Sequence, residues 1–303
     1  MKLSIAICTW NRARRLGDTL NRMASIVHPS CPWELIVVNN NSTDETESVL
    51  DSFAGRLPLR RLREPTPGLS NARNAAVRAA TGDYVIWTDD DVLVGRDWLV
   101  AYERAFRLWP DAAVFGGPIR PWFEETPPAW LTIVWQDVSS AFAVRDLGVD
   151  PLSLDGLSAI PYGANYAVRI AEQRKYLYDP DLGRRLESGL LGEEVAVIRA
   201  VIDSGMTGWW VPDASVDHLV PRERQTLDYI KSYYELSGRT AQRLNPARAP
   251  TLFGRPRWAL RKALQAEMEY RFKRLGGDPR AWIKPFCEAA YYRGMLGGSD
   301  SPR

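Results

Sequence analysis

Short runs of apolar residues alternate with segments of helical periodicity over the first 88 residues of the chain. The apolar runs have the length of buried strands and cover Leu3–Cys8, Glu34–Val38 and Tyr84–Thr88. The segments that separate them predict helices over Arg15–Ile26, Thr43–Phe53 and the Ala- and Arg-rich Ser70–Ala80. This β-α-β-α-β order predicts an α/β fold with a Rossmann-like, mainly parallel sheet that is flanked by helices on both faces. Ligands of such a sheet bind at the carboxyl ends of the strands.

The rest of the chain divides into a region of strands and turns and a helical tail. A helix is expected from Asp97 to Trp109, followed by strand character at Val114–Phe115 and a variable, Pro- and Trp-rich lobe from Pro121 to Pro161. From Thr226 onward the pattern is helical, with breaks at Asn245–Pro256 and Gly276–Pro279. We therefore predict a main domain over residues 1–225, with halves at about 1–117 and 118–225, and a C-terminal helical extension over residues 226–303.

Composition narrows the class of protein. With 303 residues, of which 45% are hydrophobic, the chain can bury a sizeable core, and its net charge of +2 is too small to indicate a nucleic-acid partner. The cysteines Cys8, Cys31 and Cys287 lie far apart without a CxxC pair, so we expect no disulfide framework, no thiolate metal site and a reducing, cytoplasmic environment. No run approaches the roughly 18 apolar residues that cross a bilayer.

Three consecutive carboxylates, Asp89, Asp90 and Asp91, directly follow the apolar run Tyr84–Thr88. Like charges concentrated at one point are costly unless a cation offsets them, and oxygen ligands suit Mg²⁺ or Mn²⁺. The alternative is a solvated acidic turn that caps the helix beginning near Asp97. The position at the end of a predicted parallel strand favours the metal site.

At these residues the sequence resembles glycosyltransferase family 2, the inverting enzymes with the GT-A fold. The resemblance runs from about Leu3 to His218, and its motifs occur in the family's order. They are Ser4–Arg12, Ile36–Asp44, Gly68–Asn74 with Gly82-Asp83, and Asp89–Asp91 as the family's DxD. The resemblance implies a GT-A domain whose first half binds a nucleotide sugar.

The resemblance also implies a division of labour among the polar residues. A nucleotide-sugar site would be formed by Thr9, Asn11, Arg12, Asn39, Asn41, Gly68, Arg73, Asp89 and Asp90. Asp91 would ligate the metal, with Asp89 at the ribose or the metal. Asn39 stands where the family more often has Asp, and an amide can donate as well as accept a hydrogen bond. The alternative for Asn39–Asn41 is a polar loop before a helix capped by Ser42 or Thr43.

A second acidic pair, Glu193-Glu194, precedes an apolar run that begins at Val195. An inverting transfer needs a carboxylate that takes the proton of the acceptor hydroxyl. The pair resembles the family's ED motif, which implies that Glu194 is the catalytic base and that Glu193 orients the acceptor or begins a helix. The alternative is that both residues compensate a helix dipole.

Two further sites resemble the family's pattern, and the chemistry of arginine suggests a third. Gly163 and Asn165 resemble a GxN strand beneath the acceptor and diphosphate, with a tight turn or bulge as the alternative. His218 falls where related enzymes often have a histidine near the metal, although a lone histidine is commonly structural. Arg222 and Arg224 could neutralise a departing diphosphate or could be solvated surface residues.

The tail carries an apolar stripe at helical spacing and a surplus of positive charge. The stripe consists of Trp258, Leu264, Met268, Phe272 and Leu275. Residues 255–293 hold ten Lys and Arg against four acidic residues. Such a segment can lie peripherally on the anionic cytoplasmic face of a membrane, which would suit a lipid-linked acceptor. The alternative is a helix that packs on the main domain with its basic face in water.

The leading hypothesis is a metal-dependent glycosyltransferase that uses Mn²⁺ or Mg²⁺. It would transfer a sugar from a nucleotide diphosphate sugar, with UDP favoured over GDP or dTDP, to a hydroxyl acceptor in bacterial polysaccharide, glycolipid or glycoconjugate synthesis. A nucleotidyltransferase is an alternative, but no glycine-rich phosphate loop follows the first predicted strand. A non-catalytic nucleotide-sugar-binding protein is another, based on Asn39 and Glu194.

Overall fold

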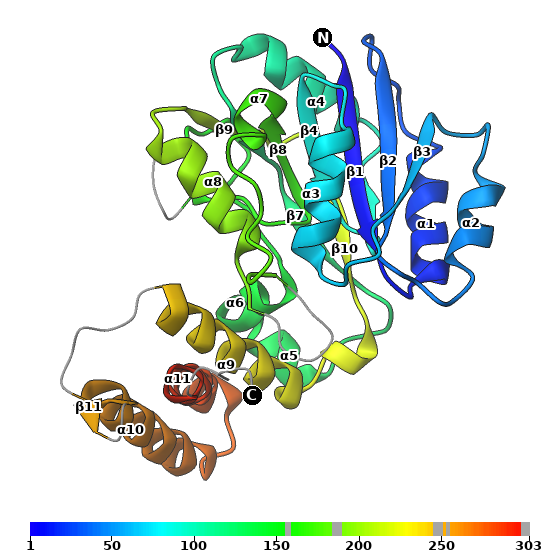
Figure 1. Ribbon diagram of the computed structural model, residues 1–303. Coiled ribbons are helices and arrows are strands. Elements are labelled where there is room, and N and C mark those ends of the chain that lie inside the picture. The colour runs from blue at the N-terminus through cyan, green and yellow to red at the C-terminus, as the bar shows by residue number, and fades with distance from the viewer. Residues whose placement is uncertain (155–158, 184–189, 245–250, 253–254, 298–303) are drawn as a thin grey trace. The chain divides into compact units, whose positions relative to one another are not determined.

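The computed structural model describes residues 1–154, 159–183, 190–244, 251–252 and 255–297 (Figure 1). The chain forms two compact units. The first comprises Met1–Trp122, Ala143–Ser188 and Gly192–Leu219, and the second comprises Phe123–Phe142, Gly189–Leu191 and Val220–Arg303. Each unit is described here by itself.

A seven-stranded sheet forms the centre of the first unit. All its neighbouring strands pair in parallel except β8, which runs antiparallel to β4 and β6. In spatial order the strands are β3 (Leu59–Arg63), β2 (Trp33–Asn39), β1 (Leu3–Thr9), β4 (Tyr84–Thr88), β8 (Asn165–Arg169), β6 (Val114–Gly116) and β9 (Gly208–Trp210). The expected mainly parallel sheet is confirmed.

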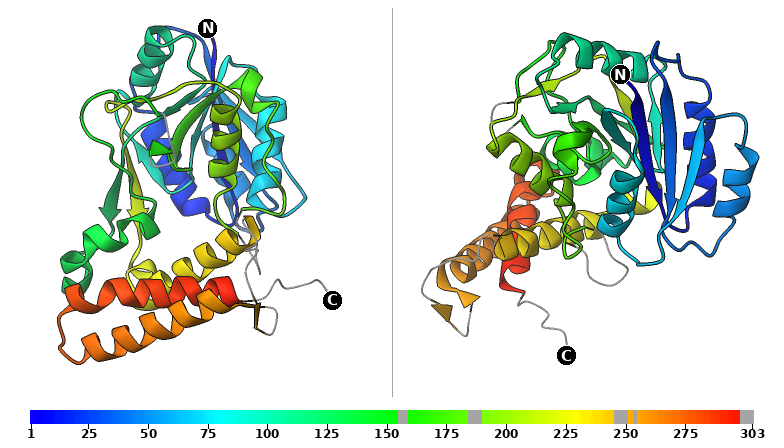
Figure 2. Two further views of the ribbon diagram at one scale, coloured as in Figure 1. Left: turned by 90° about the vertical axis from the view of Figure 1, so that its left-hand side faces the viewer. Right: turned by 45° about the horizontal axis from the view of Figure 1, so that its top comes forward.

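Helices cover both faces of this sheet (Figures 1 and 2). The alternation of side chains along β1 explains why both faces are apolar: Ile5 belongs to one core cluster and Ala6 to the other. The first cluster includes buried residues of α1 (Ala13–Met23), α2 (Thr46–Ser52) and α4 (Trp98–Leu108). The second includes residues of α3 (Leu69–Ala79), α7 (Ile170–Gln173) and α8 (Glu193–Asp203).

The apolar pattern missed one strand of this sheet. β3 has the sequence Leu-Arg-Arg-Leu-Arg and is half-buried or exposed throughout, because it lies at the edge of the sheet and pairs only with β2 among the described strands. The run Tyr84–Thr88 is therefore the fourth strand in chain order and not the third, although it still lies beside β1.

A second, three-stranded sheet brings a distant part of the chain to the end of β4. It consists of β5 (Val92–Val94), β10 (Val216–Val220) and β7 (Ile119–Phe123). β10 runs antiparallel to β5 with His218 opposite Val92, and the backbone amide of Leu219 donates to the carbonyl of Asp91. This register carries His218 to the acidic triplet.

The second unit is mainly helical and is dominated by α9 (Leu227–Leu244), α10 (Arg257–Arg274) and α11 (Pro279–Leu296). It also contains α5 (Ala129–Ile133), α6 (Trp135–Val138), the 3₁₀ turns η1 (Ser139–Phe142) and η3 (Arg222–Arg224), and the short β11 (Thr251–Leu252) and β12 (Arg255–Pro256). Gly238 of α9 and Gly294 of α11 let these helices approach closely, since a Cβ at Gly238 would lie 1.9 Å from the carbonyl oxygen of Tyr291.

The predicted C-terminal helices are therefore present. The break at Gly276–Pro279 is confirmed, because α10 ends at Arg274 and Asp278 caps α11 by accepting from the amide of Arg280. Most of the predicted break at Asn245–Pro256 lies outside the described residues. Within the part of the chain that the structure describes, no helix is both long and apolar enough to cross a membrane.

Candidate functional site

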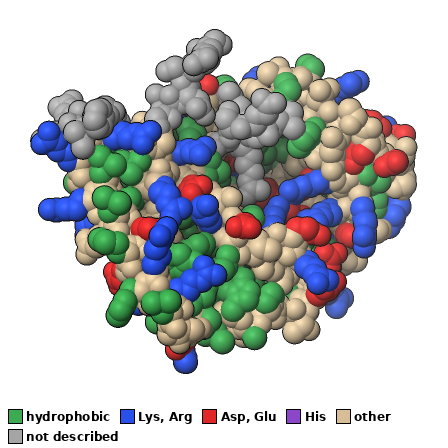
Figure 3. Space-filling view, turned by 90° about the horizontal axis from the view of Figure 1, so that it is seen from below, with side chains coloured by type: hydrophobic (Ala, Val, Ile, Leu, Met, Phe, Trp, Pro, Cys, Tyr) green, Lys and Arg blue, Asp and Glu red, His purple; other side chains and the backbone are tan. Residues whose placement is uncertain are grey.

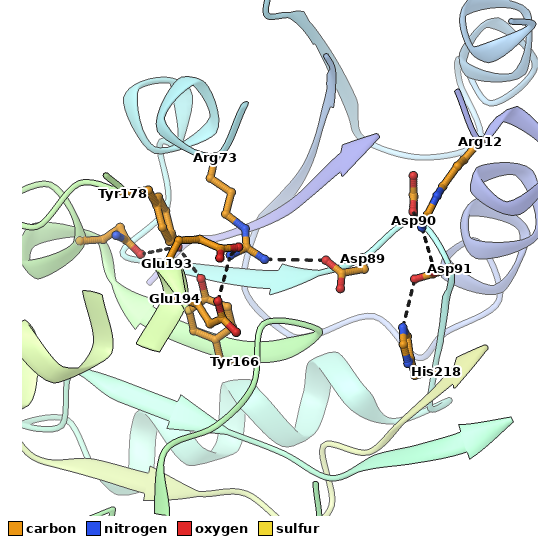
Figure 4. Close-up of polar contacts among 11 residues, drawn as sticks. Arg12, Arg73, Asp89, Asp90, Asp91, Tyr166, Tyr178, Glu193, Glu194 and His218 are labelled. Carbon is orange, nitrogen blue, oxygen red and sulfur yellow. Dashed lines mark hydrogen bonds and ion pairs between the residues drawn. The ribbon is translucent and has the colours of Figure 1, made fainter. Parts of the chain in front are cut away.

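The carboxyl ends of β1 and β4 bring polar side chains together, as the parallel pairing requires (Figure 4). The hydroxyl of Thr9 donates to Asp90 Oδ2 at 2.7 Å. Arg12 Nη1 donates to Asp90 Oδ1 at 2.9 Å and to Asp91 Oδ2 at 2.8 Å. Burial raises the pKa of Asp90 to about 6, and Arg12 opposes that shift. Asp90 thus contacts the end of β1, while Asp91 is shared with other groups.

Asp89, Asp91 and His218 form a group that could hold a metal ion, and we call it the metal-binding group. One potential ligand atom from each residue lies within 4.8 Å of the others, and His218 Nε2 is 3.4 Å from Asp91 Oδ1. Two carboxylates and an imidazole can hold a divalent cation. The alternative interpretation, an acidic cap on α4, has no support, because α4 begins at Trp98 without a side-chain cap. The residues present fit a metal.

A second cluster joins the acidic pair of α8 to this group through Arg73 of α3 (Figure 4). Arg73 Nη1 donates to Glu193 Oε1 at 2.9 Å and lies 3.9 Å from Glu194 Oε2. Its other terminal nitrogen, Nη2, lies 3.9 Å from Asp89 Oδ1. One buried guanidinium therefore connects the metal-binding group with the proposed base, whereas the sequence suggested that Arg73 lines the nucleotide pocket.

Burial, followed by the neighbouring Glu193, raises the pKa of Glu194 to about 8, although Arg73 acts in the opposite direction. The left-handed Gly192 (φ 89°) begins α8, so both glutamates lie in its first turn. A carboxyl group with this pKa exchanges a proton near neutral pH, which is what a general base requires.

Sequence reasoning missed the aromatic residues that enclose Arg73. The guanidinium carbon lies 5.8 Å from the ring centre of Trp87 and 5.4 Å from that of Tyr178. Tyr178 in turn shares a short hydroxyl–hydroxyl hydrogen bond with Tyr166. Nothing distinguishes these aromatics from ordinary core residues in the sequence, because their role depends on which charge they surround.

Hydrogen bonds join the loop after β1 to the loop after β2. Asn11 and Asn41 adopt left-handed backbone conformations, with φ of 51° and 67°. Asn11 Oδ1 accepts from the amide of Thr43 at 2.7 Å. The buried Asn39 accepts from the amide of Ser42 and donates to Glu47. These residues shape a loop at the carboxyl edge of the sheet.

The cap that the polar-loop alternative placed at Ser42 or Thr43 is wrong, because α2 begins only at Thr46. Asp44 accepts from the amide of Thr46 at 3.2 Å and from that of Ala13 at 2.9 Å.

Gly68 is held by a residue that received no role from the sequence. Its amide donates to Oδ1 of the buried Asn40 at 2.9 Å, and Asn40 Nδ2 donates to the carbonyls of Glu64 and Thr66. Gly68 has φ 126°, a conformation that favours glycine, and it begins α3. Asn40 therefore fixes the turn that leads to Arg73.

Gly163 and Asn165 lie on either side of Ala164 but face different surroundings. A Cβ at Gly163 would lie 3.0 Å from Arg73 Nη2 and 3.4 Å from Glu194 Oε1, so the glycine leaves room beside the charged cluster. Asn165 makes four side-chain hydrogen bonds within the fold: it accepts from Trp98 and Tyr102 and donates to the carbonyls of Pro118 and Ala214. Its amide has no capacity left for a sugar, and we revise its role to a structural one.

Arg222 is the remaining residue that the sequence proposed for the nucleotide-sugar site. It belongs to the second unit, where its exposed guanidinium pairs with Glu125 at 3.3 Å. Arg224 also belongs to the second unit, and the other residues that the sequence singled out for the site belong to the first.

This fold and site define a class of sugar-transferring enzymes with a GT-A domain. Residues 4–139 match the family described as glycosyl transferase family 2. Over these residues the chain is similar to glycosyltransferase family 2, and the fold, the site and the similar proteins together identify an enzyme that transfers a sugar from a nucleotide sugar. This confirms sugar transfer from a nucleotide sugar, which is the core of the leading hypothesis, over the nucleotidyltransferase and the non-catalytic binding protein.

Three known proteins illustrate the similarity. The succinoglycan biosynthesis protein ExoM of Rhizobium meliloti is 27% identical over 254 residues, which are 80% of this chain and 75% of ExoM. Staphylococcus aureus TarS 1–349, solved in complex with UDP-GlcNAc, shares the fold with a TM-score of 0.57 at 13% identity, over 98% of this chain and 90% of that one. The mannosyltransferase PcManGT from Pyrobaculum calidifontis, solved with GDP-Man and Mn²⁺, has a TM-score of 0.56 at 21% identity, over 82% and 65% of the two chains.

Proposed function

We propose that this chain is an inverting, metal-dependent glycosyltransferase that uses a nucleotide diphosphate sugar and a hydroxyl acceptor. The observation that carries the proposal is the connection through Arg73. It places the carboxylates of Glu193 and Glu194 on one side of a buried cation and Asp89, a member of the metal-binding group, on the other. An inverting transfer needs these two functions near one reaction centre.

Asp89, Asp91 and His218 are the proposed metal ligands. A bound divalent cation would neutralise charge on the diphosphate leaving group. The imidazole of His218 favours Mn²⁺ over Mg²⁺, because Mg²⁺ prefers oxygen ligands. PcManGT was solved with Mn²⁺, which agrees with this preference.

The proposed donor site is the carboxyl edge of β1, β2 and β4. Thr9, Arg12, Asp89 and Asp90 lie at the ends of β1 and β4 next to the metal-binding group. Asn11, Asn39, Asn41 and Gly68 shape the neighbouring loops. We favour a UDP-sugar, as bound by TarS, over the GDP-sugar bound by PcManGT or a dTDP-sugar. Residues 1–117 form the nucleotide-binding half of a proposed GT-A domain over 1–225, and 118–225 form its acceptor half.

Glu194 is the proposed catalytic base. Its carboxylate takes the proton of the acceptor hydroxyl as the acceptor oxygen bonds to the anomeric carbon, and the bond to the diphosphate oxygen breaks on the opposite face. Glu193, held by Arg73 at 2.9 Å, orients the base or the acceptor. The acceptor is proposed to be lipid-linked, in bacterial polysaccharide, glycolipid or glycoconjugate synthesis in the cytoplasm.

Thermal denaturation in the presence of UDP-, GDP- and dTDP-linked sugars, with and without Mn²⁺ or Mg²⁺, tests the donor and metal together. A ligand that binds only the folded protein raises its Tm. We expect one nucleotide to raise the Tm in a metal-dependent manner and Mn²⁺ to act at lower concentration than Mg²⁺. No shift with any nucleotide and metal would contradict the proposal.

Two substitutions separate the donor site from the base. Asp91→Asn is expected to abolish the metal-dependent Tm shift, whereas Glu194→Gln is expected to keep that shift and lose sugar transfer. Asp213→Asn is the matched control, because Asp213 forms only an exposed ion pair with Arg104 among the described residues. Full transfer by Glu194→Gln would show that another group is the base.

A further inference from the structure

The helix α10 exposes a row of large apolar side chains. The side chains of Leu264, Met268, Phe272 and Leu275 are 64%, 65%, 78% and 86% exposed. Their spacing of four, four and three residues puts them on one face of the helix. We call these four residues the α10 stripe. Figure 3, which views the molecule from below Figure 1, shows hydrophobic side chains next to Lys and Arg.

The opposite face of α10 explains why the stripe is not part of a core. Its buried residues are Ala259, Ala263, Ala266 and Tyr270. α10 packs side by side with α11, and Tyr270 contacts the rings of Trp282 and Phe286 there (Figures 1 and 2). These buried residues, and not the stripe, hold α10 in the second unit.

Positive charge lies within and beside the stripe. On a helical projection Arg257 and Arg261 fall within the same arc as the stripe, Arg271 lies beside it, and Lys262 lies about 80° beyond its other edge. All four are exposed. α10 carries six Lys and Arg against two acidic residues, Glu267 and Glu269. These two glutamates pair with Arg271 and Lys273, so the charge surplus lies towards the amino-terminal half of the helix.

We propose that the α10 stripe and its basic border form a docking surface for an anionic lipid membrane. Large apolar side chains enter the boundary between head groups and acyl chains, while Lys and Arg remain at the level of the anionic head groups. The charge favours a membrane as the occupant, because anionic head groups complement the Lys and Arg side chains beside the stripe. The proposal concerns α10 alone and does not depend on the donor or the chemistry of the transferase site.

Sedimentation of the full chain with vesicles tests this surface. Vesicles of phosphatidylcholine alone are compared with vesicles that also contain phosphatidylglycerol, at low and high salt. We expect binding to the anionic vesicles that weakens with salt. The variant L264S/M268S/F272S/L275S is expected to bind at least about tenfold more weakly, because the buried apolar area sets the partition. The variant R261Q/K262Q is expected to weaken binding to the anionic vesicles selectively.

The control variant L108S/V149S removes two apolar side chains of the first unit that are also exposed, and it should bind vesicles like the unmodified protein. Retention of the Tm and of the metal-dependent nucleotide shift shows that each variant is folded, and it separates this test from that of the transferase function. The proposal is overturned if the unmodified chain does not bind anionic vesicles or if the serine variant binds equally well. A dimer in sedimentation velocity that the serine variant dissociates, without vesicle binding, would assign the stripe to a second copy.

Discussion

Arg73 Nη1 donates a hydrogen bond to Glu193 Oε1 across 2.9 Å, and both side chains are buried. These residues are 120 positions apart in the chain. The pair lies where α3 and the start of α8 meet over the second core cluster, with Trp87 and Tyr178 around the guanidinium. Removal of one partner of a buried ion pair is costly, because the remaining charge stays buried without compensation.

Arg73→Met is therefore expected to lower the free energy of unfolding by about 3–5 kcal/mol, because it leaves the Glu193 carboxylate buried without its partner. The loss is measured by urea denaturation. Arg78→Met is the matched control on the same helix, since Arg78 is exposed and lies 3.8 Å from Glu64. The double variant R73M/E193Q should recover part of the loss. Equal stability of the Arg73 and Arg78 variants would mean that the buried pair does not stabilise the fold.

The pH dependence of transfer is expected to follow Glu194. Its carboxylate, the form that accepts a proton, becomes populated as pH rises through about 8, so kcat/KM should increase across that range. Arg73 lowers this pKa, and a folded Arg73→Lys variant with a looser contact should shift the rising limb to higher pH. A profile that is flat between about pH 6 and 9 would exclude Glu194 as the titrating base.

The same pKa has a consequence for stability. Because folding raises the pKa of Glu194 from 4.5 to about 8, the folded state favours the protonated carboxyl group. Its stabilising contribution is therefore complete below about pH 4.5 and is lost as pH rises through about 8. Between about pH 4.5 and 8, the free energy of unfolding of the unmodified protein should therefore fall more than that of Glu194→Gln. Urea denaturation without metal or nucleotide measures this difference. A parallel dependence of both proteins on pH would contradict this prediction.

Arg12 is expected to compete with the metal when no donor is present. Its guanidinium lies 2.8 Å from Asp91 Oδ2, and it neutralises a carboxylate that a cation would otherwise use. Arg12→Gln should therefore strengthen Mn²⁺ binding to the nucleotide-free protein by about tenfold, equivalent to about 1.4 kcal/mol. Isothermal titration calorimetry measures this affinity, with the exposed Arg22 of α1 changed to Gln as a control. Unchanged or weaker Mn²⁺ binding would rule out the competition.

The donor side of the site could be predicted from the sequence because it follows from sheet geometry. Apolar strands followed by polar residues place Thr9 and Asp90 at one edge as soon as β1 and β4 are parallel neighbours. The position of His218 beside Asp91 depends on a motif, since it requires the antiparallel pairing of β10 with β5. The highly charged β3 has no apolar pattern that predicts a strand. It needs no apolar pattern, because it lies at the edge of the sheet.

The partners of Arg73 and Asn165 could not be predicted in this way. An arginine in an Ala-rich helix and an asparagine near a glycine both have the appearance of ligand-binding residues. Their hydrogen bonds depend on which helix or loop packs against them, and local periodicity does not encode that arrangement. The exposure of the α10 stripe could not be predicted either, because the buried residues of α10, which are mainly alanines, are spaced as regularly as the stripe.

Asn165 supports the site because its side chain forms hydrogen bonds with neighbouring buried groups. Trp98 and Tyr102 of α4 donate to its Oδ1 at 2.9 Å each, and its Nδ2 reaches two backbone carbonyls. Asn165→Ala would leave these buried groups without a partner, so we expect a loss of about 3 kcal/mol in the free energy of unfolding, measured by urea denaturation. Asn71→Ala, which removes a single exposed hydrogen bond to Pro67, should cost less than about 0.5 kcal/mol. Unchanged stability together with lost nucleotide-sugar binding would instead return Asn165 to the ligand-binding role that the family resemblance suggested.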